Sequence, residues 1–298
     1  MRARYREFHA ACVSCLFVGT VAVILLSLAT VLPQTALAAG YESADGINGG
    51  MLFDKFYATS DKEKVALPKF SNAFRLDLSE IGAAGDFYRC KQCHGWDRLG
   101  CKGAYIGRAA KAGKRPNVSG ANLALTAKTY SPKKLFARIA TPGKARPTNF
   151  DPTSSNPIGD RMPAYGKIFS EAEIWDVVKF LKENAYDTTA LYKLETEGTY
   201  PSGSVSYAAI GRDGNAKAGR TIFEKQCGDC HGDNGLDIDL GGKSVGQFLR
   251  TKAYEVHHKV GFGQLGSRMK PTKLSPGQMR DLYKALTDKA AFPSKPAK

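Results

Sequence analysis

The pattern Cys-x-x-Cys-His occurs twice in this sequence, in YRCKQCHGW from Tyr88 and in KQCGDCHGDNG from Lys225. The two patterns lie about 137 residues apart. A pair of cysteines at this spacing could form a disulfide, bind zinc, act as redox thiols or attach a haem. The histidine that directly follows each second cysteine distinguishes among these chemistries.

Covalent haem attachment is the one chemistry of the four that requires all three residues. Each cysteine sulfur adds to a vinyl group of the haem, and the histidine supplies an imidazole nitrogen to the iron. Zinc ribbons place their two C-x-x-C pairs within a few tens of residues, and a thioredoxin-like pair has no need for the histidine. We therefore expect two haem c groups. Their attaching residues are Cys90, Cys93 and His94 at the first site and Cys227, Cys230 and His231 at the second.

The N-terminus predicts export. Three arginines precede an apolar run from about Leu16 to Leu32, and a small-residue cleavage site ends at Ala38. This order describes a secretory signal peptide, and we expect cleavage after Ala38. The alternative is an uncleaved membrane anchor, because the apolar run nearly reaches spanning length. Cys12 and Cys15 lie in the segment to be removed and lack a following histidine, so five cysteines remain after cleavage. From the signal peptide we expect export to a bacterial periplasm.

The chain carries a formal net charge of +15, and removal of the signal peptide would leave +13. Such an excess favours acidic partners and electrostatically steered encounters. We expect redox partner proteins with acidic docking faces and, because the protein is exported, no nucleic acid. A well-solvated basic surface without a docking role and peripheral membrane association are the alternatives.

Each haem iron needs a second axial ligand or an open face. Beyond the two motif histidines, only His257 and His258 follow the signal peptide, and adjacent residues point in different directions on a helix or strand. Methionine is therefore the expected second ligand. Met162 and Met269 each lie in a loop marked by Gly and Pro just before a helix, whereas Met279 lies in a helical apolar stripe and is expected in the core.

Both methionine loops are followed by helix-start signals. Ser170 and Glu173 form a capping box, and so do Ser275 and Gln278, with Pro276 at the favoured first helical position. The apolar stripes that follow are Ile174, Trp175, Val178 and Leu181 in one helix, and Met279, Leu282, Tyr283 and Leu286 in the other. An amphipathic helix therefore closes each half of the chain.

The two halves share one organisation. Gly82 and Gly219 each lie eight residues before the first haem cysteine, in EIGAAGDFYR and AKAGRTIFEK, and both segments predict short helices. On these motifs the chain resembles the tandem dihaem class I cytochromes c, over roughly residues 75–187 and 213–290. The resemblance implies an all-α fold of two small helical domains, each enclosing one haem.

The resemblance also implies the ligand sets, with Met162 opposite His94 and Met269 opposite His231. Two departures stand out. The step from His94 to Met162 is 68 residues against 38 in the second half, and it holds a long basic insert. The second half reads Met-Lys-Pro rather than Met-Pro, so His257 or His258 is a rival to Met269 as the distal ligand. Otherwise, these two histidines are surface residues or hydrogen-bond a haem propionate.

Cys101 keeps a different function open. It follows His94 by seven residues, a short step for a distal ligand because the chain must first pass around the haem edge. Some dihaem thiosulfate dehydrogenases, which the chain is similar to in size and tandem arrangement, use a cysteine as an axial ligand. The alternative to a ligand role is that Cys101 is a partly buried free thiol.

The predicted organisation has six segments. They are a signal peptide (1–38), an N-terminal arm expected to pack on the first domain (39–74), a first cytochrome c domain (75–187), a linker (188–212), a second cytochrome c domain (213–290) and a tail (291–298).

A haem with both axial positions filled has no easy place for a substrate, so it exchanges electrons by outer-sphere transfer. The sequence therefore favours a periplasmic dihaem electron carrier of a respiratory chain, with no catalytic residue, over an enzyme. The alternatives are a thiosulfate dehydrogenase-like enzyme and a haem subunit of a larger oxidoreductase complex.

Overall fold

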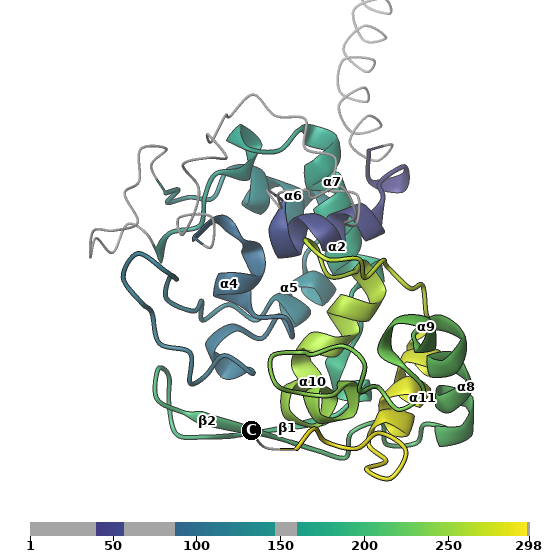
Figure 1. Cartoon of the computed structure of the whole chain (residues 1–298). Helices are drawn as coiled ribbons and strands as arrows, with labels where there is room; N and C mark the ends of the chain where they lie inside the picture. Colours follow the sequence, from purple (N-terminus) through teal and green to yellow (C-terminus); the bar gives the residue numbers. More distant parts are fainter. Residues whose placement is uncertain (1–39, 57–86, 147–159, 297–298) are drawn as a thin grey trace, which may run out of the picture. The chain divides into compact units, whose positions relative to one another are not determined.

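The computed structural model describes residues 40–56, 87–146 and 160–296 of the chain (Figure 1). Residues 44–298 form one compact unit, and residues 1–43 form a separate one. The predicted signal peptide and the segment around Gly82 lie outside the described residues. Within the described ranges, no helix is both long enough and apolar enough to cross a membrane.

The described part of the compact unit is mostly helical. Its helices are α2 (Gly46–Lys55), α4 (Cys90–His94), α5 (Leu123–Thr129), α6 (Pro132–Ala140), α7 (Glu171–Lys179), α8 (Ala216–Gln226), α9 (Gly228–His231), α10 (Val245–Phe262) and α11 (Pro276–Leu286). Short 3₁₀ turns cover Gly100–Lys102, Tyr165–Lys167 and Thr188–Ala190, and a π-helical turn (Phe180–Asn184) extends α7.

The two closing helices begin as predicted. In α7 the Ser170 hydroxyl and the Glu173 side chain complete a capping box, and in α11 Ser275 and Gln278 do the same. Both predicted apolar stripes are buried, and the Met279 side chain is fully enclosed. The expectation that Met279 is a core residue is therefore confirmed.

The fold is mostly helical, as expected, but it also contains a two-stranded antiparallel hairpin that the expectation of an all-α fold did not include. Strand β1 (Lys193–Glu197) pairs with β2 (Ser204–Ala208), so that Leu194 lies opposite Tyr207. The Tyr207 ring stacks on Tyr254 of α10, with ring centroids 5.9 Å apart. An isolated hairpin is only marginally stable in water, so packing of this kind stabilises it. No local pattern in the sequence shows such a contact, so the sequence alone predicts an irregular linker for this segment.

In the second half, α8 crosses α11 at a glycine. A Cβ atom on Gly219 would lie 1.9 Å from the backbone oxygen of Asp281, so only glycine permits this approach. The Asp281 carboxylate accepts a 2.7 Å hydrogen bond from the backbone of Asn215, the residue that caps α8. The predicted helix in AKAGRTIFEK is therefore confirmed, and its glycine has a packing role.

The first half repeats this crossing with α2 and α7. A Cβ atom on Gly49 would lie 1.9 Å from the backbone oxygen of Asp176, and the Asp176 carboxylate accepts a 2.6 Å hydrogen bond from the backbone of the capping residue Asp45. The helix that matches α8 is therefore α2, which lies in the segment predicted as an N-terminal arm. Residues 57–86, between α2 and the first haem motif, are outside the described residues.

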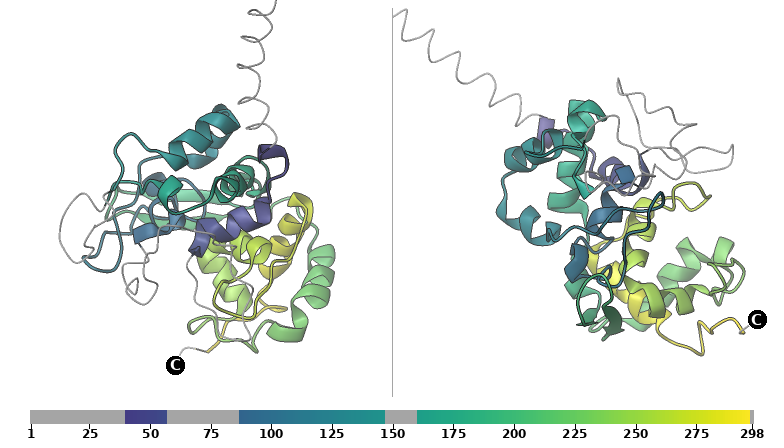
Figure 2. Two further views of the ribbon diagram at one scale, coloured as in Figure 1. Left: turned by 90° about the horizontal axis from the view of Figure 1, so that it is seen from above. Right: turned by 90° about the vertical axis from the view of Figure 1, so that its left-hand side faces the viewer.

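The two halves pack on each other through α10, which lies against α2 (Figure 2). The Phe262 ring on α10 meets Phe180 edge-on at 5.0 Å, and a Cβ atom on Gly50 of α2 would collide with the same Phe262 ring. Tyr186 of the first half donates a 2.6 Å hydrogen bond to the backbone oxygen of Leu274. The halves therefore share a buried core.

Candidate functional site

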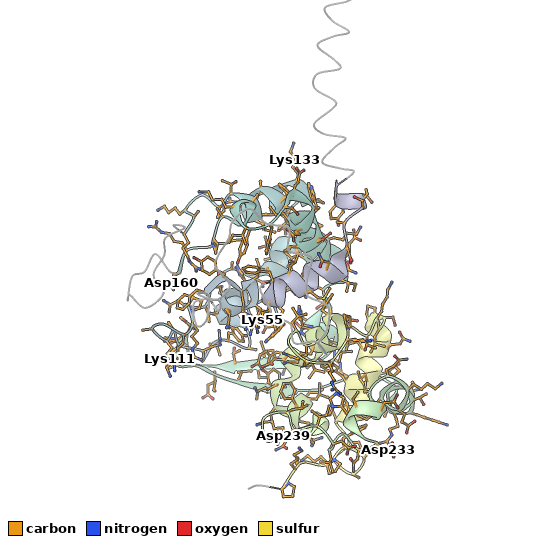
Figure 3. The ribbon with its side chains drawn as sticks, turned by 45° about the horizontal axis from the view of Figure 1, so that its top comes forward. Lys55, Lys111, Lys133, Asp160, Asp233 and Asp239 are labelled. Carbon is orange, nitrogen blue, oxygen red and sulfur yellow. The ribbon has the colours of Figure 1, made fainter. Side chains whose placement is uncertain are left out.

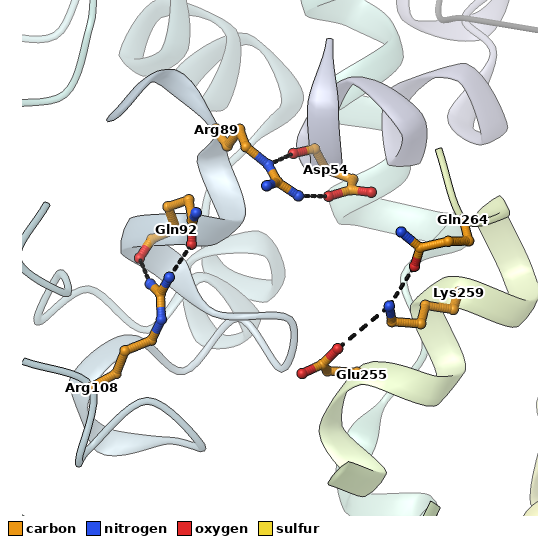
Figure 4. A network of polar contacts seen from close by, with 7 residues as sticks. All are labelled: Asp54, Arg89, Gln92, Arg108, Glu255, Lys259 and Gln264. Atoms are coloured by element: carbon orange, nitrogen blue, oxygen red, sulfur yellow. Dashed lines mark hydrogen bonds and ion pairs between the residues drawn. The ribbon is translucent and has the colours of Figure 1, made fainter. Parts of the chain in front are cut away.

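The first C-x-x-C-H motif forms the short helix α4, which is fixed against α2 (Figure 4). Arg89, the residue just before α4, donates from Nε to the backbone oxygen of Asp54 at 2.7 Å and from Nη2 to the Asp54 carboxylate at 2.5 Å. The Asp54 side chain is almost fully buried, and charge-assisted bonds of this kind are strong. The first helix of the half therefore positions the motif that follows it.

Burial decides the ionisation of the side chains in the first motif. Burial lowers the pKa of His94 to about 4, so its imidazole is neutral at pH 7, and its Nδ1 atom is buried without a hydrogen-bond partner. Burial raises the pKa of Cys90 to about 12 and that of Cys93 to about 11, and both cysteines are free. A reactive redox dithiol would instead have a lowered thiol pKa.

The Met162 segment lies beside this motif. The backbone of Arg146 donates to the Met162 backbone oxygen at 3.1 Å, and the buried Arg146 guanidinium donates to the Phe87 backbone oxygen. Tyr165, three residues after Met162, donates from its hydroxyl to the Tyr88 backbone oxygen at 2.5 Å. Two buried polar contacts therefore join the predicted distal-ligand loop to the chain entering α4.

The second motif opens onto a cavity of about 340 Å³. Three of its predicted haem residues, Cys227, His231 and Met269, line this one cavity. Burial lowers the pKa of His231, and its Nδ1 atom, like that of His94, is buried without a partner. The thiol, imidazole and thioether donors around one cavity fit a haem c held by Cys227 with His231 and Met269 as axial ligands. Cys230, the other attaching residue, is exposed.

The cavity walls suit an apolar macrocycle with carboxylate substituents. Apolar side chains from α8, α10, α11 and the loop before α10 form most of the lining: Phe223, Leu240, Val245, Phe248, Val256, Val260, Leu282 and Leu286. The polar lining comes from Lys252, Glu255, Lys259 and Gln264. The Lys259 ammonium lies 3.5 Å from the Glu255 carboxylate and donates to the Gln264 side chain (Figure 4).

His257 and His258 are core residues, which corrects the suggestion that they are surface residues. Their side chains are 2% and 1% exposed, and burial lowers the pKa of both well below the usual value. Among the described residues, those that line the second cavity include His231 and Met269 but neither of these two histidines. They lie on the part of α10 that faces the first half, where the sequence could not show their neighbours.

Cys101 is a partly buried free thiol. It packs beside a buried cluster that contains Trp96, Tyr105 and Val118, and its backbone donates to the Ser119 oxygen at 2.9 Å. It is not among the described residues that line the second cavity. In the described ranges, no three His, Cys, Asp or Glu side chains gather as a metal cluster.

Sequence reasoning missed three residues that shape the sites: Gly49, Arg146 and Lys259. The N-cap and glycine spacing of DGING, repeated in NAKAG, was the available signal for Gly49. Lys259 follows Glu255 by four residues, which is a visible helical pair. No pattern in the sequence pointed to Arg146, because its contacts join segments far apart in the chain.

Comparison with known proteins assigns the first half. Residues 83–185 match the family model described as Cytochrome c, so this segment is a cytochrome c domain that carries at least one covalently bound haem c. Such a domain implies haem-based electron transfer. Searches of curated proteins and of solved structures returned no match.

Proposed function

We propose that this protein is an exported dihaem c-type cytochrome that carries single electrons between redox partners. One observation carries the proposal: the second half places Cys227, His231 and Met269 around one cavity. The same half repeats the capped glycine crossing of the first, with Gly219 on Asp281 where the first has Gly49 on Asp176. The second half is therefore built like the half that includes the cytochrome c domain.

The chain's own residues set the chemistry. A haem c supplies a one-electron couple when it is bound. His94 with Met162, and His231 with Met269, would fill both axial positions and raise the reduction potential relative to two histidines. The apolar lining contributed by residues such as Phe223 and Leu282 excludes water, which also tunes the potential. No axial position is then left for a substrate, which favours a carrier over an enzyme.

We propose a periplasmic location and a partner with an acidic face. Residues 98–150 contain twelve Lys and Arg and no Asp or Glu, so positive charge is concentrated in this stretch of the first half. Lys111 and Lys133 are exposed in it, and Figure 3 shows both well apart from the exposed Asp233 and Asp239 of the second half. Charge of one sign along this stretch favours docking of the acidic partner there.

Cys101 is a partly buried free thiol that packs against an apolar cluster, which supports the carrier over the thiosulfate dehydrogenase-like alternative. The role of a fixed subunit in a larger complex would be recognised by a stable partner in pull-downs of the exported protein.

The first experiment is a haem count followed by a redox titration. Mass spectrometry of the purified protein should show two attached haems, and one after Cys227→Ser/Cys230→Ser. A near-infrared band reports Met sulfur on ferric haem; we expect its intensity to correspond to two such haems. Met162→His and Met269→His should each remove half of it and lower one potential.

Met279→Leu is the matched control, because Met279 is a buried methionine of the core rather than a proposed ligand. It should leave the band and both potentials unchanged. A single haem in the wild-type protein would overturn the dihaem proposal. Two haems with only half of the expected band would overturn one methionine assignment.

A further inference from the structure

We propose that Trp96 and Lys259 form the electronic contact between the two haem sites. The inference rests on the proposed dihaem function and names the residues through which the sites exchange electrons. With a haem bound at each site, these two side chains would lie on the path by which one electron passes from one site to the other, and no bond would form or break. The two side chains mediate this step without being oxidised.

Two faces of the helix α10 contact different parts of the molecule. Phe248, Lys252, Glu255 and Lys259, at helical spacing, line the cavity that holds His231 and Met269. The rings of Tyr254, His258 and Phe262 instead meet rings of the first half or the hairpin. The part of α10 that follows its kink at Lys252 therefore lies between the second cavity and the first half.

Trp96 is the point where the first haem motif reaches this helix. It follows His94 by two residues, so a short covalent path joins its ring to the proposed iron ligand. The ring is 4% exposed, and its centroid lies 4.6 Å from that of His258 on α10. The Lys91 ammonium lies 4.6 Å from the same centroid. A flat ring packed against several groups has one fixed position.

Lys259 completes the contact from the second site. Its ammonium lies 5.9 Å from the Trp96 ring centroid, within the range of cation–π attraction, and 5.6 Å from the Phe248 centroid. Both Lys259 and Phe248 line the second cavity. One side chain therefore lies within cation–π range of the first motif's tryptophan and also lines the second site. Electron tunnelling falls steeply with the gap to be crossed, so this packed layer is the favoured route.

The chain offers a matched control for each residue. Trp175, the other tryptophan, is also buried but packs on Phe136 of α6, with centroids 4.4 Å apart. Lys252 lines the same cavity as Lys259 and lies 5.3 Å from the Phe248 centroid. Among the described contacts of Lys252 there is none with Trp96. Trp175 matches Trp96 in residue type and burial, and Lys252 matches Lys259 in residue type and in lining the second cavity. Among their described contacts, neither control residue joins Trp96 to that cavity.

The test is flash reduction of the purified dihaem protein, followed by absorbance changes that distinguish the two sites. The phase whose rate is independent of protein concentration reports exchange between the sites, and Cys227→Ser/Cys230→Ser should abolish it. We expect Trp96→Leu and Lys259→Met to slow this phase and Trp175→Phe and Lys252→Met to leave it at the wild-type rate. Both lysine variants should lower the potential of the second site, because each removes a positive charge that favours the ferrous form.

Equal rates in Lys259→Met and Lys252→Met would overturn the proposal, and this comparison holds even where Trp96→Leu fails to fold. A wild-type protein with one haem overturns the proposed function together with the contact. If the protein carries two haems and the rate of exchange between the sites is unchanged in all four variants, the dihaem carrier still stands and only the proposed contact is overturned.

Discussion

At the residue scale, burial decides what the polar side chains can do. His258 is 1% exposed among the rings of Trp96, Phe180 and Phe262, and its side chain hydrogen-bonds the backbone of Gly50. Burial lowers its pKa and that of His257 well below the usual value, so both are neutral in the folded protein. Their role in the described structure is to join the two halves.

The neutral histidines predict a loss of stability in mild acid. Their pKa is near 6.5 in the unfolded chain, so below that pH the unfolded chain binds protons that the folded protein does not. The free energy of unfolding should fall as the pH drops from about 6.5 to 5, by at most about 1.4 kcal/mol per pH unit for each histidine. His258→Phe should reduce this slope by one histidine's share, measured by denaturant unfolding at several pH values.

Phe53→Leu is the control for this slope. Phe53 packs against His258, with centroids 6.1 Å apart, and carries no titratable group. The variant should be less stable at every pH with the wild-type slope. A His258→Phe protein with the wild-type slope would contradict the assignment of the proton to His258.

At the element scale, each half is organised by the crossing of its first and last helices. In both crossings a glycine on one helix lets a backbone oxygen of the other approach, and an aspartate on the last helix accepts from the backbone at the start of the first. These paired contacts fix the distance and the register of the two helices. The haem motif follows the first helix directly in the second half, where α8 ends at Gln226.

Alanine at either crossing should destabilise the protein. The added Cβ of Gly49→Ala or Gly219→Ala meets a backbone oxygen that cannot move without its helix, so we expect a loss of about 1–3 kcal/mol in the free energy of unfolding. The expected loss is a net value, because the higher helix propensity of alanine stabilises the helix by about 1 kcal/mol and partly offsets the steric cost. Denaturant unfolding of each variant measures it.

Gly277→Ala in α11 is the matched control. A Cβ atom at Gly277 would meet only the Ser275 hydroxyl oxygen, at 3.9 Å, so alanine should be neutral or stabilising there. If Gly219→Ala were as stable as Gly277→Ala, the two helices could move apart without loss of stability, which would contradict this prediction.

At the scale of the whole molecule, α10 makes the two halves one cooperative structure. Phe262 and Tyr186 bury apolar surface between them, and a single compact unit spans residues 44–298. We expect thermal unfolding to show one transition, with the absorbance signals of both haem sites lost at the same midpoint. Phe262→Ala should lower both midpoints together, with a cost of about 3–5 kcal/mol. Two separated transitions would contradict the shared core.

The net positive charge predicts salt-dependent encounters. Electron transfer from the reduced protein to an anionic oxidant such as ferricyanide should slow as ionic strength rises, because salt screens exposed charges beyond about 8 Å at 0.15 M. Lys133→Glu/Lys134→Glu on α6 should lower the rate at low salt by about tenfold. Lys284→Glu/Lys289→Glu, an equal change of charge in the second half, should have the smaller effect if docking occurs on the first half.

The sequence by itself determined the local features of this protein. Both capping boxes, both apolar stripes and the helix before the second motif follow from contacts within a few residues, which a sequence displays directly. The same holds for the C-x-x-C-H motif inside the cytochrome c domain, because attachment requires neighbouring residues.

Only the tertiary structure decided which distant segments meet. The hairpin is held on α10 by Tyr207, α2 takes the position of a first helix, and His258 lies beside Trp96 although 162 residues separate them in the chain. Burial and close packing depend on groups that are far apart in sequence, so no local pattern specifies them. The proposed contact between the sites belongs to this second class, because it exists only where α10 brings Lys259 to Trp96.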